Sequence, residues 1–197
     1  MLVDFLKHGS NGALAIAIVA ACAAALAGFA PLLPWAIALG ALCFFASEYT
    51  THRFMFHAPP SKVPFVLRLQ HRLHYDHHVE PSRLDLLFLP LWFVVPATAA
   101  FAAVYAIATR DATLTFSLVT GSLCGLLSYE WVHYVAHVPF KPLTPYGRWI
   151  KKYHLWHHFK SERHWFGVTN PLVDVAGRTY AGVDDVPKSP SVRILRR

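Results

Sequence analysis

The sequence predicts an all-α integral membrane protein with four transmembrane helices, arranged as two hairpins, and a cytoplasmic helical cap. Hydrophobic residues make up 55% of the 197 residues, a length that fits a single domain. Three long stretches contain no Asp, Glu, Lys or Arg: residues 8–47, 86–109 and 112–129. A transmembrane helix needs about 20 apolar residues, so these stretches have room for four spans.

The first hairpin is expected from the longest uncharged stretch. Residues 13–30 and 35–47 form its helices, and the turn is Pro31-Leu32-Leu33-Pro34. The first helix is rich in Ala and Gly, which allow helices to approach closely inside a bilayer. Asp4 near its start and the apolar run beyond it favour a retained helix over a cleaved signal peptide.

The second hairpin is expected from residues 86–109 and 112–129, with Arg110 and Asp111 at the turn. Pro90 or Pro96 is expected to kink its first helix. Four spans place both ends of the chain on one side of the membrane.

The basic residues orient these spans. Segments 1–12, 48–85 and 130–197 contain one, five and eleven Lys or Arg residues, and only Arg110 falls on the opposite side. The positive-inside rule therefore makes the basic face cytoplasmic. The net charge of +7 fits a basic face that lies beside anionic lipid headgroups and is attracted to them. No motif indicates nucleic-acid binding.

The cap is expected to contain several helices outside the lipid. Residues 48–57 continue the second span, and residues 148–159 form a later helix. Residues 62–79 are amphipathic, and the pattern fits a helix at the membrane interface or one packed in the core. Residues 1–185 are interpreted as one membrane domain and residues 186–197 as a mobile basic tail.

Four histidine clusters lie on the predicted cytoplasmic face. They have the spacings H-x4-H, H-x2-H-H, H-x3-H and H-x2-H-H. Residues three and four apart share a face of an α-helix, so each H-x2-H-H is expected to aim three imidazoles at one point. His52 and His57, five apart, lie about 140° from each other on an α-helix and could serve different metals. The candidate ligands are His52, His57, His74, His77, His78, His133, His137, His154, His157 and His158.

Imidazole is a common ligand of zinc, iron, copper and nickel. Ten ligands exceed the four of a structural zinc ion, so two ions with four to five nitrogens each are expected. Glu48 and Glu130 precede clusters and are candidate partners of a second ring nitrogen; Asp76 and Asp174 are weaker ones. His71 and His164 adjoin clusters and are interpreted as surface or supporting residues.

A histidine-rich di-metal site at the mouth of a membrane bundle suits oxygen-dependent attack on a lipid C–H bond in a dry pocket. A metal transporter or sensor is the alternative from another class. Transport would predict ionisable residues along the spans, and the predicted spans contain none.

The order and spacing of the clusters resemble the fatty-acid hydroxylase superfamily of membrane-bound non-haem di-iron oxygenases, over residues 48–180. Residues 52–57, 82–84 and 166–174 are similar to the fatty-acid 2-hydroxylase branch. Val173 stands where that branch usually has an aromatic residue, and residues 176–179 depart from its Phe-Gly-Thr.

The resemblance implies that the ten histidines hold two iron ions, with O2 as co-substrate and no catalytic residue beyond the ligands. Zinc is the alternative occupant in purified protein. The implied activity is hydroxylation of a membrane lipid, with a fatty-acyl chain as the expected substrate. A lipid or sterol desaturase, or a carotenoid hydroxylase, would use the same site. Electrons would come from a separate ferredoxin or b-type cytochrome and its reductase, docked on the basic face.

Overall fold

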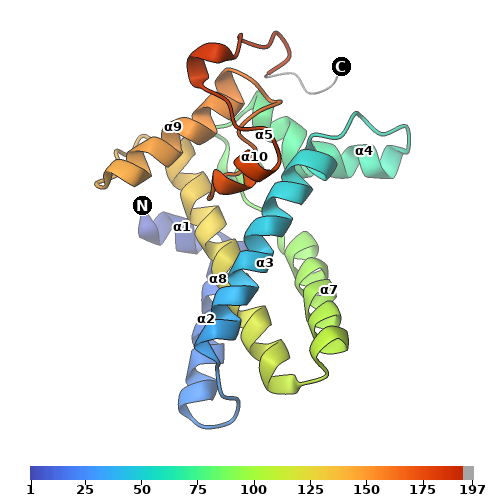
Figure 1. Ribbon diagram of the computed structural model, residues 1–197, viewed down its shortest axis with the longest axis vertical. Helices are drawn as coiled ribbons and strands as arrows, with labels where there is room; N and C mark the ends of the chain where they lie inside the picture. The colour runs from blue at the N-terminus through green and yellow to red at the C-terminus, as the bar shows by residue number, and fades with distance from the viewer. Residues whose placement is uncertain (193–197) are drawn as a thin grey trace. The chain divides into compact units, whose positions relative to one another are not determined.

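The computed structural model describes residues 1–192, and within this range the protein contains helices and no strand (Figure 1). The predicted all-α class is confirmed. Residues 193–197, which include three of the basic residues of the predicted tail, lie outside the described part. The helices are α1 Leu2–Lys7, α2 Gly9–Leu26, α3 Pro34–Thr51, α4 Pro64–Gln70, α5 Asp76–Val79, α6 Leu84–Leu87, α7 Leu91–Thr109, α8 Ala112–His137, α9 Pro145–Phe159 and α10 Leu172–Ala176. The π-helices η1 His52–Phe56 and η2 His71–Tyr75 and the 3-10 helix η3 Val183–Asp185 complete the set.

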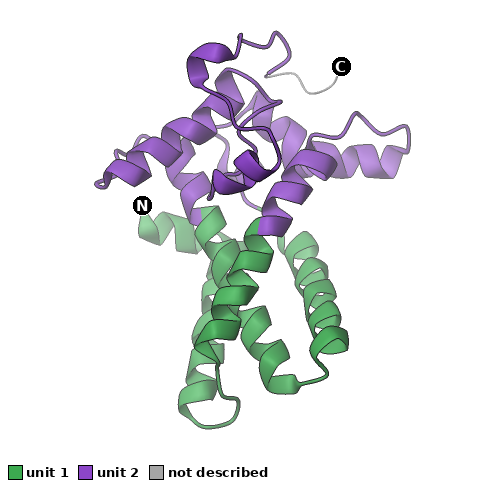
Figure 2. Ribbon diagram, viewed as in Figure 1, with its two compact units in different colours: residues 1–45, 89–130 green, residues 46–88, 131–197 purple. Residues whose placement is uncertain are grey.

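The chain forms two compact units (Figure 2). Unit 1 comprises Met1–Phe45 and Leu89–Glu130, and unit 2 comprises Ala46–Phe88 and Trp131–Arg197. All ten candidate histidines belong to unit 2.

Within residues 1–192, three helical segments are long and apolar enough to cross a membrane: Gly9–Leu26, Leu84–Thr109 and Ala112–His137. Only 22% of the apolar window of each of the first two is buried inside the protein, as expected of surfaces that face lipid. Helix α3 is not among the three, because its last five residues are polar. The four-span topology therefore stays a prediction.

Helices α3 and α8 cross closely in unit 1 through two glycines. A Cβ atom on Gly40 would lie 2.0 Å from the carbonyl oxygen of Leu118, and one on Gly121 would lie 2.0 Å from that of Ile37. No larger residue fits at either position without moving a backbone. The crossing uses small residues in the way that membrane helices commonly do.

Unit 2 departs from the predicted helices in two places. The segment predicted as one helix over residues 62–79 consists of α4, η2 and α5, with a π turn in the middle. Helix α9 starts three residues earlier than predicted, because Pro145 occupies its first turn and the Thr144 side chain accepts a hydrogen bond from the Gly147 N–H (3.0 Å).

The described start of the predicted tail, residues 186–192, packs against the rest of unit 2. Val186 and Val192 are buried, and the hydroxyls of Ser189 and Ser191 donate to the Glu162 carboxylate at 3.0 and 2.8 Å. A mobile basic tail over residues 186–197 stays a prediction, and residues 193–197 fall outside the described range.

Candidate metal centre

The ten histidines gather into two groups of five in unit 2. Within each group, one ring nitrogen from every residue lies within 4.8 Å of the others. Group A contains His52, His57, His74, His78 and His157. Group B contains His77, His133, His137, His154 and His158.

The Nε2 atoms converge within each group. In group A, His57 Nε2 lies 2.7 Å from His74 Nε2 and 2.9 Å from His157 Nε2. In group B, the Nε2 atoms of two pairs, His77 with His133 and His137 with His154, are each 3.0 Å apart. Nitrogens bound at about 2.1 Å to one ion lie at most about 4.2 Å apart, so these four pairs are close enough to share an ion.

The π turn η1 places His52 and His57 in the same group. The His57 N–H donates to the His52 carbonyl (3.0 Å), the i to i+5 bond of a π-helix, so residues five apart face the same side. The expectation that these two histidines could serve different metals is wrong, because it assumed α-helical rotation.

Each H-x2-H-H cluster is divided between the groups, which corrects the expectation of three imidazoles at one point. In α9, His154 and His158 belong to group B and His157 to group A. On an α-helix, His158 lies about 40° from His154 around the axis, whereas His157 lies about 60° from His154 in the opposite direction. The second cluster shows the same division, with His77 in group B and its neighbours in group A.

Backbone carbonyls orient three rings of group A. The Nδ1 atoms of His52, His157 and His78 lie 2.5, 2.7 and 3.2 Å from the carbonyl oxygens of residues 166, 164 and 192. A carbonyl can only accept, so each Nδ1 carries the proton, and Nε2 is left with a lone pair for a metal.

Two Nε2 atoms support the prediction that the site binds cations. His78 Nε2 and His158 Nε2 are buried and have no hydrogen-bond partner within residues 1–192. Buried polar atoms without a partner are costly and uncommon in folded proteins. An ion in each group would satisfy them.

Burial keeps these histidines neutral. It lowers the pKa of His52 to about 4 and that of His78 to about 3, and it holds the pKa of His57, His74 and His157 well below the usual value. Neutral imidazole is the form that binds metals, so group A needs no deprotonation at pH 7.

Two buried carboxylates hold the loop that carries the Phe166 carbonyl. Glu48 accepts from the N–H groups of Val168 (2.7 Å) and Thr169 (3.1 Å), and Asp174 accepts from those of residues 166 and 167 at 2.8 and 2.7 Å. Burial raises the pKa of Glu48 to about 7, although these hydrogen bonds act in the opposite direction. The hydrogen bonds of Glu48 and Asp174 thus fix residues 166–169. Because the Phe166 carbonyl contacts the His52 ring, these two carboxylates also position His52.

The other candidate partners have different contacts. Glu130, in unit 1, accepts from the Leu89 N–H (3.1 Å). Asp76 lies 2.9 Å from Nδ1 of His71, which belongs to neither group.

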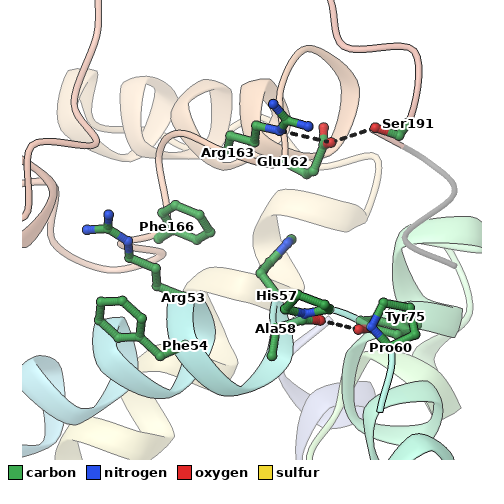
Figure 3. Close-up of a pocket in the computed structure, with 11 residues that line it drawn as sticks. Arg53, Phe54, His57, Ala58, Pro60, Tyr75, Glu162, Arg163, Phe166 and Ser191 are labelled. Atoms are coloured by element: carbon green, nitrogen blue, oxygen red, sulfur yellow. Dashed lines mark hydrogen bonds and ion pairs between the residues drawn. The ribbon is translucent and has the colours of Figure 1, made fainter. Parts of the chain in front are cut away.

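A cavity of about 460 Å³ opens beside group A (Figure 3). His57 lines it together with Phe54, Tyr75 and Phe166. Arg53, also on its wall, donates to the Tyr49 hydroxyl (2.6 Å) and to the carbonyl of residue 177 (2.8 Å). The cavity gives a route to an imidazole of group A, and both aromatic rings and the charged side chains of Arg53, Glu162 and Arg163 line it.

The fold and the site define an all-helical protein with apolar helices suited to a membrane and two buried histidine groups suited to metal ions. Residues 37–179, well over half of the chain, match the fatty acid hydroxylase family. The chain belongs to this family, as the histidine spacing predicted.

Named relatives agree. A dihydroceramide fatty acyl 2-hydroxylase of Arabidopsis thaliana is 32% identical over 153 residues, which cover 77% of this chain and 63% of the relative. A ceramide very long chain fatty acid hydroxylase of Saccharomyces cerevisiae is 33% identical over 142 residues, or 70% of this chain and 35% of the relative. The predicted similarity to the fatty-acid 2-hydroxylase branch is confirmed. The chain spans only about a third to just under two thirds of the length of these relatives.

A solved structure shares the fold. It is full-length scs7p with only the hydroxylase domain visible, and it is 30% identical with a TM-score of 0.76. The match covers 90% of this chain and 67% of that chain. Metal binding by the ten histidines stays a prediction, supported by the convergence described above.

Proposed function

We propose that this protein is a membrane oxygenase that hydroxylates a C–H bond of a lipid, with a fatty-acyl chain as substrate, O2 as co-substrate and electrons from outside the chain. The observation that supports it most strongly is the pair of five-imidazole groups in a member of the fatty acid hydroxylase family. The relatives are named as fatty acyl and ceramide fatty acid hydroxylases, which favours an acyl chain.

The ten histidines would hold two ions, one in each group. Iron supplies the oxygen activation and C–H oxidation that this reaction needs, and zinc is a possible occupant after purification. The chain itself positions the ring nitrogens: backbone carbonyls fix the His52, His157 and His78 tautomers. Burial shields most imidazoles of both groups from water and keeps them uncharged.

The cavity beside group A is the proposed route by which an acyl chain reaches the reacting centre. Phe54, Tyr75 and Phe166 line it with aromatic rings, and His57 of group A also lies on its wall. Tyr75 donates to the carbonyl of Ala58, which fixes one wall. These contacts would hold a methylene chain against the metal ligands while excluding solvent.

The proposed topology has four spans, with α3 as the second, and both histidine groups on the cytoplasmic face. The distribution of Lys and Arg supports this orientation, since Arg110 alone falls on the other side. A separate ferredoxin or b-type cytochrome, with its reductase, would deliver electrons to the basic face.

Expression in a lipid-producing host, followed by lipidomics, tests the proposal. The expected product is a lipid heavier by one oxygen; a lipid lighter by two hydrogens would identify a desaturase instead. His157→Ala should abolish the change, because it removes a ring of group A. His71→Ala is the matched control and should keep it, because His71 lies outside both groups. An unchanged lipid profile despite full metal loading and reductant would refute oxygenase activity.

A further inference from the structure

A second cavity in unit 2, of about 520 Å³, is strongly basic. It lies between α9 and the loop that joins it to α8, residues 138–144. We call it the basic groove; the residues that define it are Phe140, Lys141, Arg148, Trp149, Lys151 and Lys152. Four of these six side chains are cationic, and no carboxylate is among the described residues that line the groove.

Two of the four cations are held in place by backbone. Lys151 Nζ donates to three carbonyls of residues 135–140, at 2.7 to 3.0 Å. Arg148 Nη1 donates to the carbonyls of residues 142 and 143, at 3.2 and 2.6 Å. Carbonyl dipoles orient these cations without neutralising them, so the groove has a fixed positive charge.

The other two cations are free to bind a ligand. Lys141 and Lys152 are exposed, and neither has a hydrogen-bond or ion-pair partner within residues 1–192. Four uncompensated positive charges around one cavity repel each other, and an anion would relieve that repulsion. Phosphate, with several acceptor oxygens, suits two flexible ammonium groups and a guanidinium.

The position of the groove along the chain favours a lipid as the source of that phosphate. Helix α8 is a candidate span of 26 residues and the groove begins beyond its end. A span uses about 20 residues, so the remaining turns extend about 9 Å into the headgroup region. Trp149 lines the groove and Leu143, in the same loop, is 88% exposed, and this pairing of Trp and basic residues is typical of membrane interfaces.

We propose that the basic groove binds the phosphate headgroup of an anionic phospholipid. Lys141 and Lys152 contact the phosphate, and Arg148 and Lys151 supply fixed charge behind it. Juxtamembrane clusters of four or more basic residues commonly recognise such lipids. The proposal does not depend on hydroxylase activity, because neither the metal groups nor an acyl substrate enters it.

Lipid binding to the full-length chain in detergent, followed by native mass spectrometry, tests this. The probes are phosphatidylglycerol and phosphatidylcholine of the same acyl length. The wild-type chain should prefer phosphatidylglycerol. The double variant Lys141→Gln with Lys152→Gln should weaken that binding about 30-fold. Each basic residue contributes about 1 kcal/mol, and a loss of about 1.4 kcal/mol weakens binding tenfold.

The matched control is Lys62→Gln with Lys188→Gln, which removes the same charge from exposed positions away from the groove. It should bind phosphatidylglycerol as the wild type does, and all three proteins should unfold at the same temperature. Equal weakening in the control, or equal wild-type affinity for both lipids, would overturn the proposal. Displacement of the lipid by an equal concentration of inorganic phosphate would indicate a soluble ligand instead. Unchanged lipid binding with slower reduction by an acidic redox protein would assign the groove to an electron donor.

Discussion

Replacing Asp174 with Asn should loosen group A from a distance. Asp174 is fully buried, and its carboxylate accepts four hydrogen bonds of 2.6 to 2.9 Å. The donors are the N–H groups of Phe166 and Gly167 and the hydroxyls of Tyr153 and Thr179. Each carboxylate oxygen accepts from one backbone N–H and one hydroxyl, so an amide nitrogen at either position deprives one N–H of its acceptor.

The magnitude follows from those contacts. A hydrogen bond to a charged group contributes about 1.5–3 kcal/mol, and Asn loses the bond to one backbone N–H, whereas a hydroxyl can turn to accept from the amide; the expected cost is therefore at least about 1.5–3 kcal/mol. That is a large part of the 5–15 kcal/mol by which proteins are typically stable. The affected loop contains the Phe166 carbonyl that orients His52, and loss of such a partner typically costs about 10–100-fold in metal affinity.

The assay combines thermal unfolding in detergent with metal affinity measured by chelator competition. Asp174→Asn should lower both, with the larger loss of affinity at one of the two bound ions. Asp184→Asn is the control, because Asp184 is exposed. Wild-type stability together with wild-type affinity for both ions would refute the role assigned to the Asp174 carboxylate.

The division of neighbouring histidines gives a second prediction: His78→Ala and His77→Ala should each lose one ion, but from different groups. The double variant His78→Ala with His52→Ala should keep one ion, because both residues belong to group A, whereas His77→Ala with His52→Ala should bind none. Equal numbers of bound ions in the two double variants would contradict the division. Gly121→Ala should destabilise the protein by about 1–3 kcal/mol, because its Cβ would lie 2.0 Å from a carbonyl oxygen of α3, whereas Gly9→Ala, with nothing within 4 Å, should not; similar unfolding temperatures would count against the close crossing. Burial lowers the pKa of His52 to about 4, so as the pH falls the unfolded chain binds a proton at this ring before the folded chain does. The free energy of unfolding of metal-free protein should therefore fall by up to about 3 kcal/mol from this residue between about pH 6.5 and pH 4. Unfolding measured across that range checks it, and a flat profile would speak against a buried neutral ring.

The helices that the sequence predicted best are those bounded by charge. Helix α7 ends at Thr109 and α8 begins at Ala112, on either side of Arg110 and Asp111, as expected. The Asp111 side chain accepts from the Leu114 N–H (2.8 Å), which explains why α8 starts there. Charge gaps located this turn because a polar pair interrupts two apolar runs.

All ten predicted histidines come together in the structure, but their division into two groups differs from the prediction. For His52 and His57 the prediction assumed α-helical geometry, which η1 does not follow. For the H-x2-H-H clusters it overlooked that, even in the α-helix α9, the ring of His157 lies to the other side of His154 from that of His158. A π turn has no strong composition signal, so H-x4-H alone could not reveal that His52 and His57 face the same way.

The supporting carbonyls were beyond sequence reasoning for a different reason. The carbonyls that orient His52 and His78 belong to residues 114 positions further along the chain. Every residue has a carbonyl, so no residue type marks those that serve this purpose. Only the resemblance of residues 166–174 to the family hinted that this loop contributes.

Helix α9 contributes to both histidine groups, and so does the segment formed by η2 and α5. Each of these two helical segments therefore carries histidines of both candidate metal sites. When one group binds its ion, the orientation of both segments is fixed, and this positions the histidine rings of the other group. Filling is therefore expected to be cooperative: with too little metal, the population should divide into empty and doubly occupied molecules, with few that carry a single ion.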